Sequence, residues 1–232
     1  DNISIRAESI VGRTNVQVEE PFWFRDEFGE DSRGRCTGNV SSFSIAAGAL
    51  TQTVRNHQIT FNGKVTNPSI SVEFTNSASS NTVVSFGCQS NTYSGSVFAN
   101  TSQTSGRRYG VQKTAANRLI VLKWNNTGIV SDLAFTPFDC ILEDATDYRL
   151  DIEYVTDDSF TVSLYKVSDS SLIVTRTVTD NNTSAAGLFN TGWVNYSEYT
   201  LGNTVNSIEI SGTRVYQKPI HRGAMLETYH DG

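Results

Sequence analysis

The stretch that decides the fold is DYRLDIEYVTDDSFTVSLYKVSDSSLIVTRTV, residues 147–178, in which apolar and polar residues alternate almost without a break. In its first run Leu150 and Ile152 fall on one face of an extended chain, and Arg149 falls on the other. A period of two residues is typical of a β-strand with one buried and one solvated face. The segments TDDS and SDSS divide the stretch into three runs, because Asp and Ser side chains hydrogen-bond the backbone of tight turns. The sequence therefore predicts a three-stranded antiparallel meander.

The same pattern recurs along most of the chain. Strand-like runs follow one another at short intervals from residue 42 onward, and the clearest early one is PSISVEFTN, residues 68–76. Segments with helical composition, such as TAAN and SAAG, are too short for more than a turn. Many short strands separated by turns predict an all-β, antiparallel two-sheet β-sandwich. We expect residues 1–20 to form an N-terminal arm or lead-in strand, residues 21–216 the sandwich, and residues 217–232 a C-terminal tail.

Composition narrows the possible functions. The chain has 232 residues, of which 38% are hydrophobic and 18% charged, so it can bury a substantial core. Its net charge of −6 and its one compact basic pair, Arg107 and Arg108, disfavour nucleic-acid binding. No apolar run approaches the ~18 residues of a membrane-spanning helix, so we expect no membrane insertion. The three cysteines form neither a CxxC motif nor a Cys/His cluster, which disfavours zinc or redox chemistry.

Several of these segments resemble the concanavalin-A-like, laminin-G-like jelly-roll superfamily, which includes lectins and glucanases. The likeness lies in FRDEF, SFSIAAGALTQT, the predicted meander and the closing GLF…VNSIEISG, and it covers roughly residues 22 to 212. The resemblance implies two curved antiparallel sheets, with sugar bound at the concave face or at the rim loops and sometimes a structural calcium ion. A glycan is therefore the expected partner.

The resemblance also raises the possibility of catalysis. Some members hydrolyse glycans with carboxylates in the pattern Glu-x-Asp-x-Glu, and the matching positions here are Arg149, Asp151 and Glu153. Residues i and i+2 share a strand face, and a retaining glycosidase needs its two carboxyl groups about 5–5.5 Å apart. Asp151 and Glu153 are thus the candidate catalytic pair. Because arginine replaces the first carboxylate, we expect a solvated ladder of charges instead.

Sugar sites need aromatic rings that stack on the apolar face of a sugar, together with amide or charged groups that hold its hydroxyls. Residues 190–203, which we expect to form a loop, and a second polar stretch, residues 88–110, offer such groups. The candidate ligand-binding residues are Trp193, Tyr196, Tyr199, Asn195, Tyr93, Tyr109 and Arg108. The alternative is that the rings anchor the packing of these segments.

Two acidic segments are candidates for a structural Ca²⁺ site, because calcium prefers hard oxygen ligands. Asp26 lies in RDEF, and Asp144 lies in DCILEDATD. Neither segment has the spacing of an EF-hand loop. The alternative is that both are ordinary solvated turns.

These features favour a non-catalytic carbohydrate-binding jelly-roll module carried on a larger assembly. A virion or phage appendage such as a tail fibre, or an extracellular or cell-surface protein, would suit the unpaired thiol and the Asn/Ser/Thr richness. The alternative is a structural or decoration protein of a virion, whose aromatic segments pack against other subunits or identical copies in a homo-oligomer. A glycoside hydrolase or polysaccharide lyase is the third hypothesis.

Overall fold

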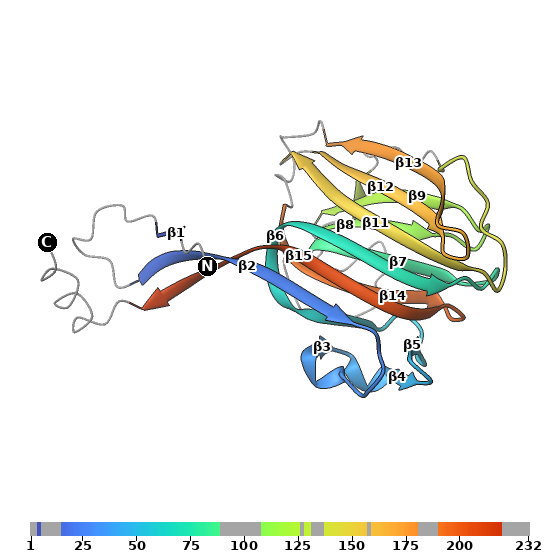
Figure 1. Cartoon of the computed structure of the whole chain (residues 1–232), viewed down its shortest axis with the longest axis horizontal. Helices are drawn as coiled ribbons and strands as arrows, with labels where there is room; N and C mark the ends of the chain where they lie inside the picture. The colour runs from blue at the N-terminus through green and yellow to red at the C-terminus, as the bar shows by residue number, and fades with distance from the viewer. Residues whose placement is uncertain are drawn as a thin grey trace, which may run out of the picture.

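The computed structural model describes residues 4–5, 15–88, 108–125, 128–130, 137–156, 159–180 and 190–219. Within these residues the chain forms fifteen β-strands and two short 3-10 turns (Figure 1). No helix in this part of the chain is long and apolar enough to cross a membrane. The elements are β1 (Ser4–Ile5), β2 (Asn15–Asp26), η1 (Arg33–Arg35), β3 (Cys36–Gly38), η2 (Val40–Ser42), β4 (Phe43–Ala46), β5 (Ala49–Gln52), β6 (Gln58–Thr75), β7 (Asn81–Cys88), β8 (Arg108–Lys113), β9 (Leu119–Asn125), β10 (Gly128–Val130), β11 (Asp147–Thr156), β12 (Ser159–Lys166), β13 (Ser171–Thr179), β14 (Thr191–Thr200) and β15 (Thr204–Pro219).

The long strand β6 belongs to two sheets. Its first half, residues 58–66, pairs with β14 and β3, and its second half, residues 69–75, pairs mainly with β11 and β15. Between the halves lie Asn67, with a positive φ of 48°, and Pro68. A proline has no N–H to donate, so it fits the point where β6 changes partners. The sequence pattern indicated a run that begins at Pro68, whereas the structure has one continuous strand from Gln58 to Thr75.

Two antiparallel sheets follow from this pairing. Sheet I has the order β10-β9-β8-β7-β14-β6-β3, and sheet II has the order β13-β12-β11-β6-β15-β2-β1. The hairpin of β4 and β5 is attached to the start of β15. The residues predicted to form a meander are β11, β12 and β13, in that order and antiparallel. The predicted all-β, antiparallel two-sheet sandwich is therefore confirmed.

The core lies between the two sheets. Phe86 of sheet I and Phe160 of sheet II are both buried, and their ring centroids lie 5.1 Å apart. Ile70, Val72 and Phe74 alternate along β6 with polar residues, and all three point into this core. Full burial of one such side chain contributes about 1.5–3 kcal/mol. The alternation seen in the sequence is thus the alternation between core and outer face.

Strands β2 and β15 extend beyond the body of the sandwich. The whole of β2 pairs with residues 208–219 of β15, from Asp26 opposite Ile208 to Asn15 opposite Pro219, whereas β6 follows β15 only as far as Thr213. The remaining part projects as a two-stranded ribbon (Figure 1). Strand β2 runs across residue 20, where we expected the N-terminal arm to end, and β15 runs across residue 216, where we expected the sandwich to end.

The interpretation of residues 190–203 as a loop is wrong. Most of this segment is β14, which lies between β6 and β7 in the middle of sheet I. A Cβ atom on Gly192 would lie 2.3 Å from the carbonyl carbon of Gly87, so glycine lets the two strands approach. The strand was missed because residues 194–198 of β14 are all buried, polar residues such as Asn195 and Ser197 included, so burial does not alternate along them.

Candidate functional site

A groove of about 320 Å³ lies on the outer face of sheet II. The strand register places Arg25, Glu209, Ser71 and Asp151 opposite one another in a single row that crosses four strands. Side chains of directly opposed residues in antiparallel strands point to the same face of a sheet. The pairing of the strands alone therefore places polar side chains on the floor of the groove. The lining residues are Arg25, Ser69, Ile70, Ser71, Glu73, Arg149, Asp151, Glu153, Ser207, Ile208 and Glu209.

Asp151, one of the two candidate catalytic acids, is held in place on this floor. Its carboxylate accepts a hydrogen bond of 2.7 Å from the Ser71 hydroxyl and one of 3.1 Å from Nε of Arg149. The guanidinium of Arg149 lies 4.4 Å from the ring centroid of Tyr165. Half-exposed ion pairs of this kind contribute about 0–1 kcal/mol, so the contact orients Asp151 more than it stabilises the fold.

The side chains of Glu153 on β11 and Glu73 on β6 are available to a ligand. Among the residues that the structure describes, neither side chain makes a hydrogen bond or an ion pair. Glu73 lies opposite Arg149, four residues along β11 from Glu153, which corresponds to about 13 Å of strand at ~3.3 Å per residue. Glycosidases hold their two acids about 5–10 Å apart. The backbone positions that carry Glu73 and Glu153 are therefore farther apart than the two acids of a glycosidase.

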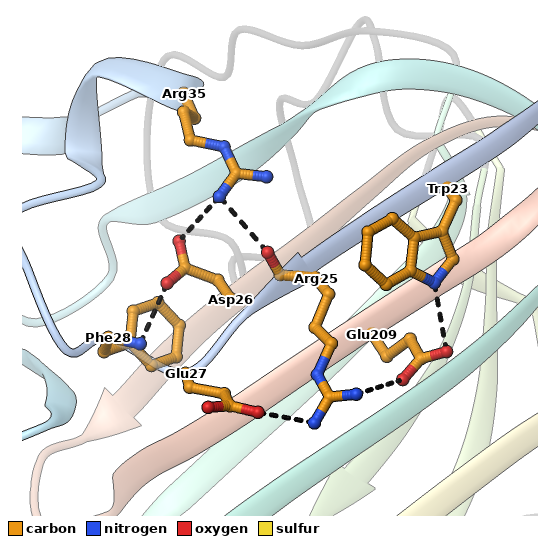
Figure 2. A network of polar contacts seen from close by, with 7 residues as sticks. All are labelled: Trp23, Arg25, Asp26, Glu27, Phe28, Arg35 and Glu209. Atoms are coloured by element: carbon orange, nitrogen blue, oxygen red, sulfur yellow. Dashed lines mark hydrogen bonds and ion pairs between the residues drawn. The ribbon is translucent and has the colours of Figure 1, made fainter.

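The rim of the groove carries an exposed indole. Trp23 is 63% exposed, and its Nε1 donates a hydrogen bond of 3.2 Å to Oε1 of Glu209 (Figure 2). The other oxygen of Glu209 lies 4.0 Å from Nη1 of Arg25, which also contacts Glu27 through Nη2. An apolar ring is thus fixed beside charged hydrogen-bonding groups, which is the combination that a sugar requires.

Sequence analysis did not propose Trp23 as a site residue, although a usable signal exists. In PFWFRDEF the residues Phe22 and Phe24 pack on or within the core, and Trp23 and Arg25 alternate with them on the exposed face. A period-two interpretation of this segment places the indole and the guanidinium on one solvated face. That interpretation does not reveal Glu209, which comes from a strand 186 residues away.

The calcium candidates lie in two different places. Asp26 faces the inner side of β2, where Oδ1 accepts the Phe28 N–H at 2.8 Å and Oδ2 lies 3.8 Å from Arg35 (Figure 2). The carboxylate of Asp144 accepts the backbone N–H of Ala78 at 2.7 Å. In the described part of the chain, no three His, Cys, Asp or Glu side chains gather closely enough to hold a metal ion. Each of the two carboxylates accepts a hydrogen bond from a nearby backbone N–H.

Three of the predicted sugar-binding residues share the outer face of sheet I. Trp193 and Asn195 alternate along β14 with the core residues Val194 and Tyr196, and so they point outward. Arg108 lies opposite Trp124, over whose ring its guanidinium is centred at 4.3 Å. Asn195 and Arg108 are buried, at 2% and 0% exposure, so this face is covered at both positions.

The predicted tyrosines are not brought together. Tyr196 and Tyr109 are core residues with 3% and 2% exposure, and their rings cannot be reached from solvent. Tyr199 is 48% exposed near the end of β14. Tyr93 lies outside the described residues. The structure therefore separates the described members of the predicted set: Tyr196 and Tyr109 lie in the core, Asn195 and Arg108 are covered on the outer face, and Tyr199 is exposed.

A polar network inside the sandwich surrounds Glu198. Tyr196 donates its hydroxyl to Oε1 at 2.6 Å, and the Gly202 N–H donates to Oε2 at 2.8 Å. Burial raises the pKa of Glu198 to about 7 and lowers the pKa of nearby Lys113 to about 8. The Lys113 ammonium donates to the backbone carbonyl of Ser80 at 2.9 Å. The adjoining cavity of about 20 Å³ has room for little more than one water molecule, so this network belongs to the core.

Comparison with known proteins identifies the fold. No family model and no curated protein sequence matches the chain. Among solved structures, the Lotus tetragonolobus seed lectin superposes with a TM-score of 0.61 at 9% identity, over 85% of this chain and 100% of that one. Winged bean acidic lectin superposes with a TM-score of 0.57 at 11% identity, over 85% of this chain and 100% of that one. A Bacillus subtilis protein with a galectin-like fold superposes with a TM-score of 0.55 at 8% identity, over 82% of this chain and 96% of that one.

These identities are low, and what they establish is the architecture. The chain is a concanavalin-A-like jelly-roll sandwich, as the sequence resemblance predicted. Function must be argued from the site, because one fold hosts many activities.

Proposed function

We propose that the chain is a non-catalytic carbohydrate-binding jelly-roll module that holds a glycan in the groove of sheet II, with Trp23 as the stacking ring. The observation that carries the proposal is the exposed indole of Trp23, oriented by Glu209 at the edge of a polar groove. Isolated exposed apolar residues are common on proteins, but an oriented ring beside a groove is a typical ligand platform.

The charges of the groove favour a neutral glycan over an anionic one. Its lining includes four carboxylates and two guanidinium groups, and both guanidinium groups lie close to carboxylates. Sugar hydroxyls can donate hydrogen bonds to the carboxylates of Glu73 and Glu153, whereas these carboxylates would repel a sulfate or carboxylate group on the glycan. We therefore expect sialylated and sulfated glycans to bind poorly, and more poorly still at low ionic strength, where screening is weak.

The geometry supports binding over hydrolysis. Asp151 is held by Arg149 and Ser71, and the two carboxylates without partners are carried by backbone positions about 13 Å apart, which is more than the separation of the two acids in a glycosidase. Winged bean acidic lectin, which shares the fold, is known in complex with methyl-α-D-galactose. That ligand makes neutral hexoses a sensible first set of probes.

The proposal is tested by screening the purified chain on a glycan array and measuring the affinity of each hit by calorimetry. Replacing Trp23 with alanine is expected to weaken binding at least about tenfold, because losing one stacked ring costs about 1.4 kcal/mol or more. Tyr199→Ala is the matched control, since that ring is also exposed but lies outside the groove. A folded wild-type chain that binds no glycan would contradict the proposal.

The array also decides between this groove and the outer face of sheet I. Trp193→Ala leaves the groove untouched but removes an indole that lies 5.1 Å from the ammonium of Lys64. Loss of binding in Trp193→Ala and retention in Trp23→Ala would move the site to sheet I.

A second candidate function is a structural subunit of a larger assembly, and the projecting β2–β15 ribbon favours it. A ribbon that leaves the body of the sandwich offers a surface for other subunits, and Leu172 and Ile173 on the edge strand β13 are exposed. An assembly on a virion, or at an extracellular or cell surface, is part of this proposal. It is tested by measuring the mass of the purified chain in solution, and by probing purified virions and intact cells with an antibody against the sandwich.

A further inference from the structure

The two sheets are connected at one end of the core by a buried pair of opposite charges. Lys123 lies in β9 of sheet I, and Asp180 follows β13 of sheet II. The Nζ atom of Lys123 contacts Oδ2 of Asp180, and both side chains are only 1% exposed. In every other ion pair between described residues, at least one side chain is 37% exposed or more. Burying two charges in this way gives little stability, so the pair calls for an explanation.

A third reactive group completes the cluster. The Tyr109 hydroxyl donates a hydrogen bond of 2.6 Å to the same Oδ2 atom, and the Tyr109 ring centroid lies 5.9 Å from Nζ of Lys123. The rings of Phe86 and Phe160 pack against Tyr109 at centroid distances of 5.7 and 5.3 Å. An amine, a carboxyl group and a phenol therefore meet in an aromatic environment that excludes bulk water.

From this geometry we propose that Lys123 and Asp180 condense to form an intramolecular isopeptide bond. The Lys123 ammonium first passes one proton to Oδ2 of Asp180, and the neutral Nζ atom then attacks Cγ, so that a C–N bond forms. The Tyr109 hydroxyl protonates Oδ2, the C–Oδ2 bond breaks, and the oxygen leaves as water. Tyr109 then regains a proton from the nitrogen, so one amide and one water are produced and no oxidant or other reactant is consumed.

Positioning lowers the barrier to this reaction. Amines and carboxylic acids do not condense in dilute water, but fixed neighbours inside a protein reach effective concentrations of about 10⁵–10⁸ M. The site is dry, so the reverse hydrolysis lacks its water. Folding brings the groups together from positions 57 residues apart in the sequence, and the bond therefore forms only after the sandwich has closed.

The bond would link the two sheets covalently. β9 belongs to sheet I, and β13 is the edge strand of sheet II. All three cysteines are free, so no disulfide provides such a link. A crosslink of this kind restricts the unfolded chain as a disulfide does, but it resists reduction.

Intact-mass spectrometry of the purified, denatured chain tests the proposal. The expected mass is lower than that of the amino-acid sequence by one water molecule, and peptide mapping should find a branched peptide that joins Lys123 to Asp180. A mass equal to that of the intact sequence would overturn the proposal, as would a water loss located elsewhere. The wild-type chain alone decides the question, so the test does not depend on a variant that folds.

Variants then assign the roles. Lys123→Arg and Asp180→Ala should each restore the full mass of their own sequence, because each removes one reacting group. Tyr109→Phe keeps the packing and removes the hydroxyl, so it should slow the appearance of the crosslinked form after refolding. A Tyr109→Phe chain that crosslinks at the wild-type rate would remove Tyr109 from the reaction.

Discussion

The buried carboxyl group of Glu198 should make the stability of the fold depend on pH. Burial raises its pKa from 4.5 to about 7, so the folded chain favours the neutral acid and the unfolded chain favours the carboxylate. The stabilisation is complete below the unfolded pKa and is lost as pH rises through the folded pKa. Between about pH 5 and about pH 7.5 this group alone should remove about 2 kcal/mol from the free energy of unfolding, at ~1.4 kcal/mol per pKa unit.

Lys113 acts in a different pH range. Burial lowers its pKa from 10.5 to about 8, so its contribution is present above the unfolded pKa and is lost as pH falls through about 8. The combined contribution of Glu198 and Lys113 to the free energy of unfolding is therefore smallest close to pH 7 to 8. The pH range below about 7 isolates Glu198, because Lys113 stays charged there in both states.

Urea unfolding at several pH values, with Glu198→Gln measured in parallel, tests this reasoning. Glutamine keeps the shape and can still accept the Tyr196 hydroxyl, but it cannot ionise. We expect the unfolding free energy of the wild type to fall by about 2 kcal/mol across the acidic range relative to the variant, at constant m. The comparison uses the slope with pH, since losing the Gly202 contact to Oε2 shifts the variant by a constant amount. Equal slopes for the two proteins would refute the reasoning.

Three further predictions concern the sandwich itself. Phe86→Ala should lower the unfolding free energy by about 3–5 kcal/mol, since this ring is fully buried between the sheets; a loss below about 1 kcal/mol in urea unfolding would argue against the described core. Gly192→Ala should disrupt β14, because its Cβ would lie 2.3 Å from Gly87, whereas Gly34→Ala, with open space around it, should unfold at the wild-type temperature in circular dichroism. Arg149→Ala should change stability by less than about 1 kcal/mol, and a larger loss in the same assay would show that its ion pair does more than orient the groove.

The fold could be predicted largely from local patterns. Residues 147–178 form β11, β12 and β13. Strands β11 and β12 each have one face in the core, and Val174 and Val178 of β13 pack against it, so the alternation in the sequence follows burial. The same rule failed for β14, which is buried on both faces and includes Asn195 and Ser197 on the outer one. The sequence also did not predict that β6 continues through Pro68, since a proline usually marks the end of a strand.

The site was harder to predict because it depends on strand neighbours. Asp151 and Glu153 were correctly placed on one strand face, but the groove around them is formed by residues of β6, β15 and β2. Trp23 is a candidate site residue because Glu209 orients its indole, and only the register of β2 with β15 brings Glu209 beside it. Conversely, Tyr196 looked like a surface ring in a loop and is a core residue, because β14 occupies the centre of sheet I.

The most direct test of the proposed site is the oxidation of tryptophan in the presence and absence of a glycan selected on the array. N-Bromosuccinimide should modify Trp23, which is 63% exposed, well before Trp124, which is 3% exposed. Peptide mapping then reports the protection of each indole. Protection of Trp23 by saturating glycan, with the modification of Trp193 unchanged, is the result that a glycan in the groove of sheet II predicts. Unaltered oxidation of Trp23 in the saturated complex would show that the glycan binds elsewhere.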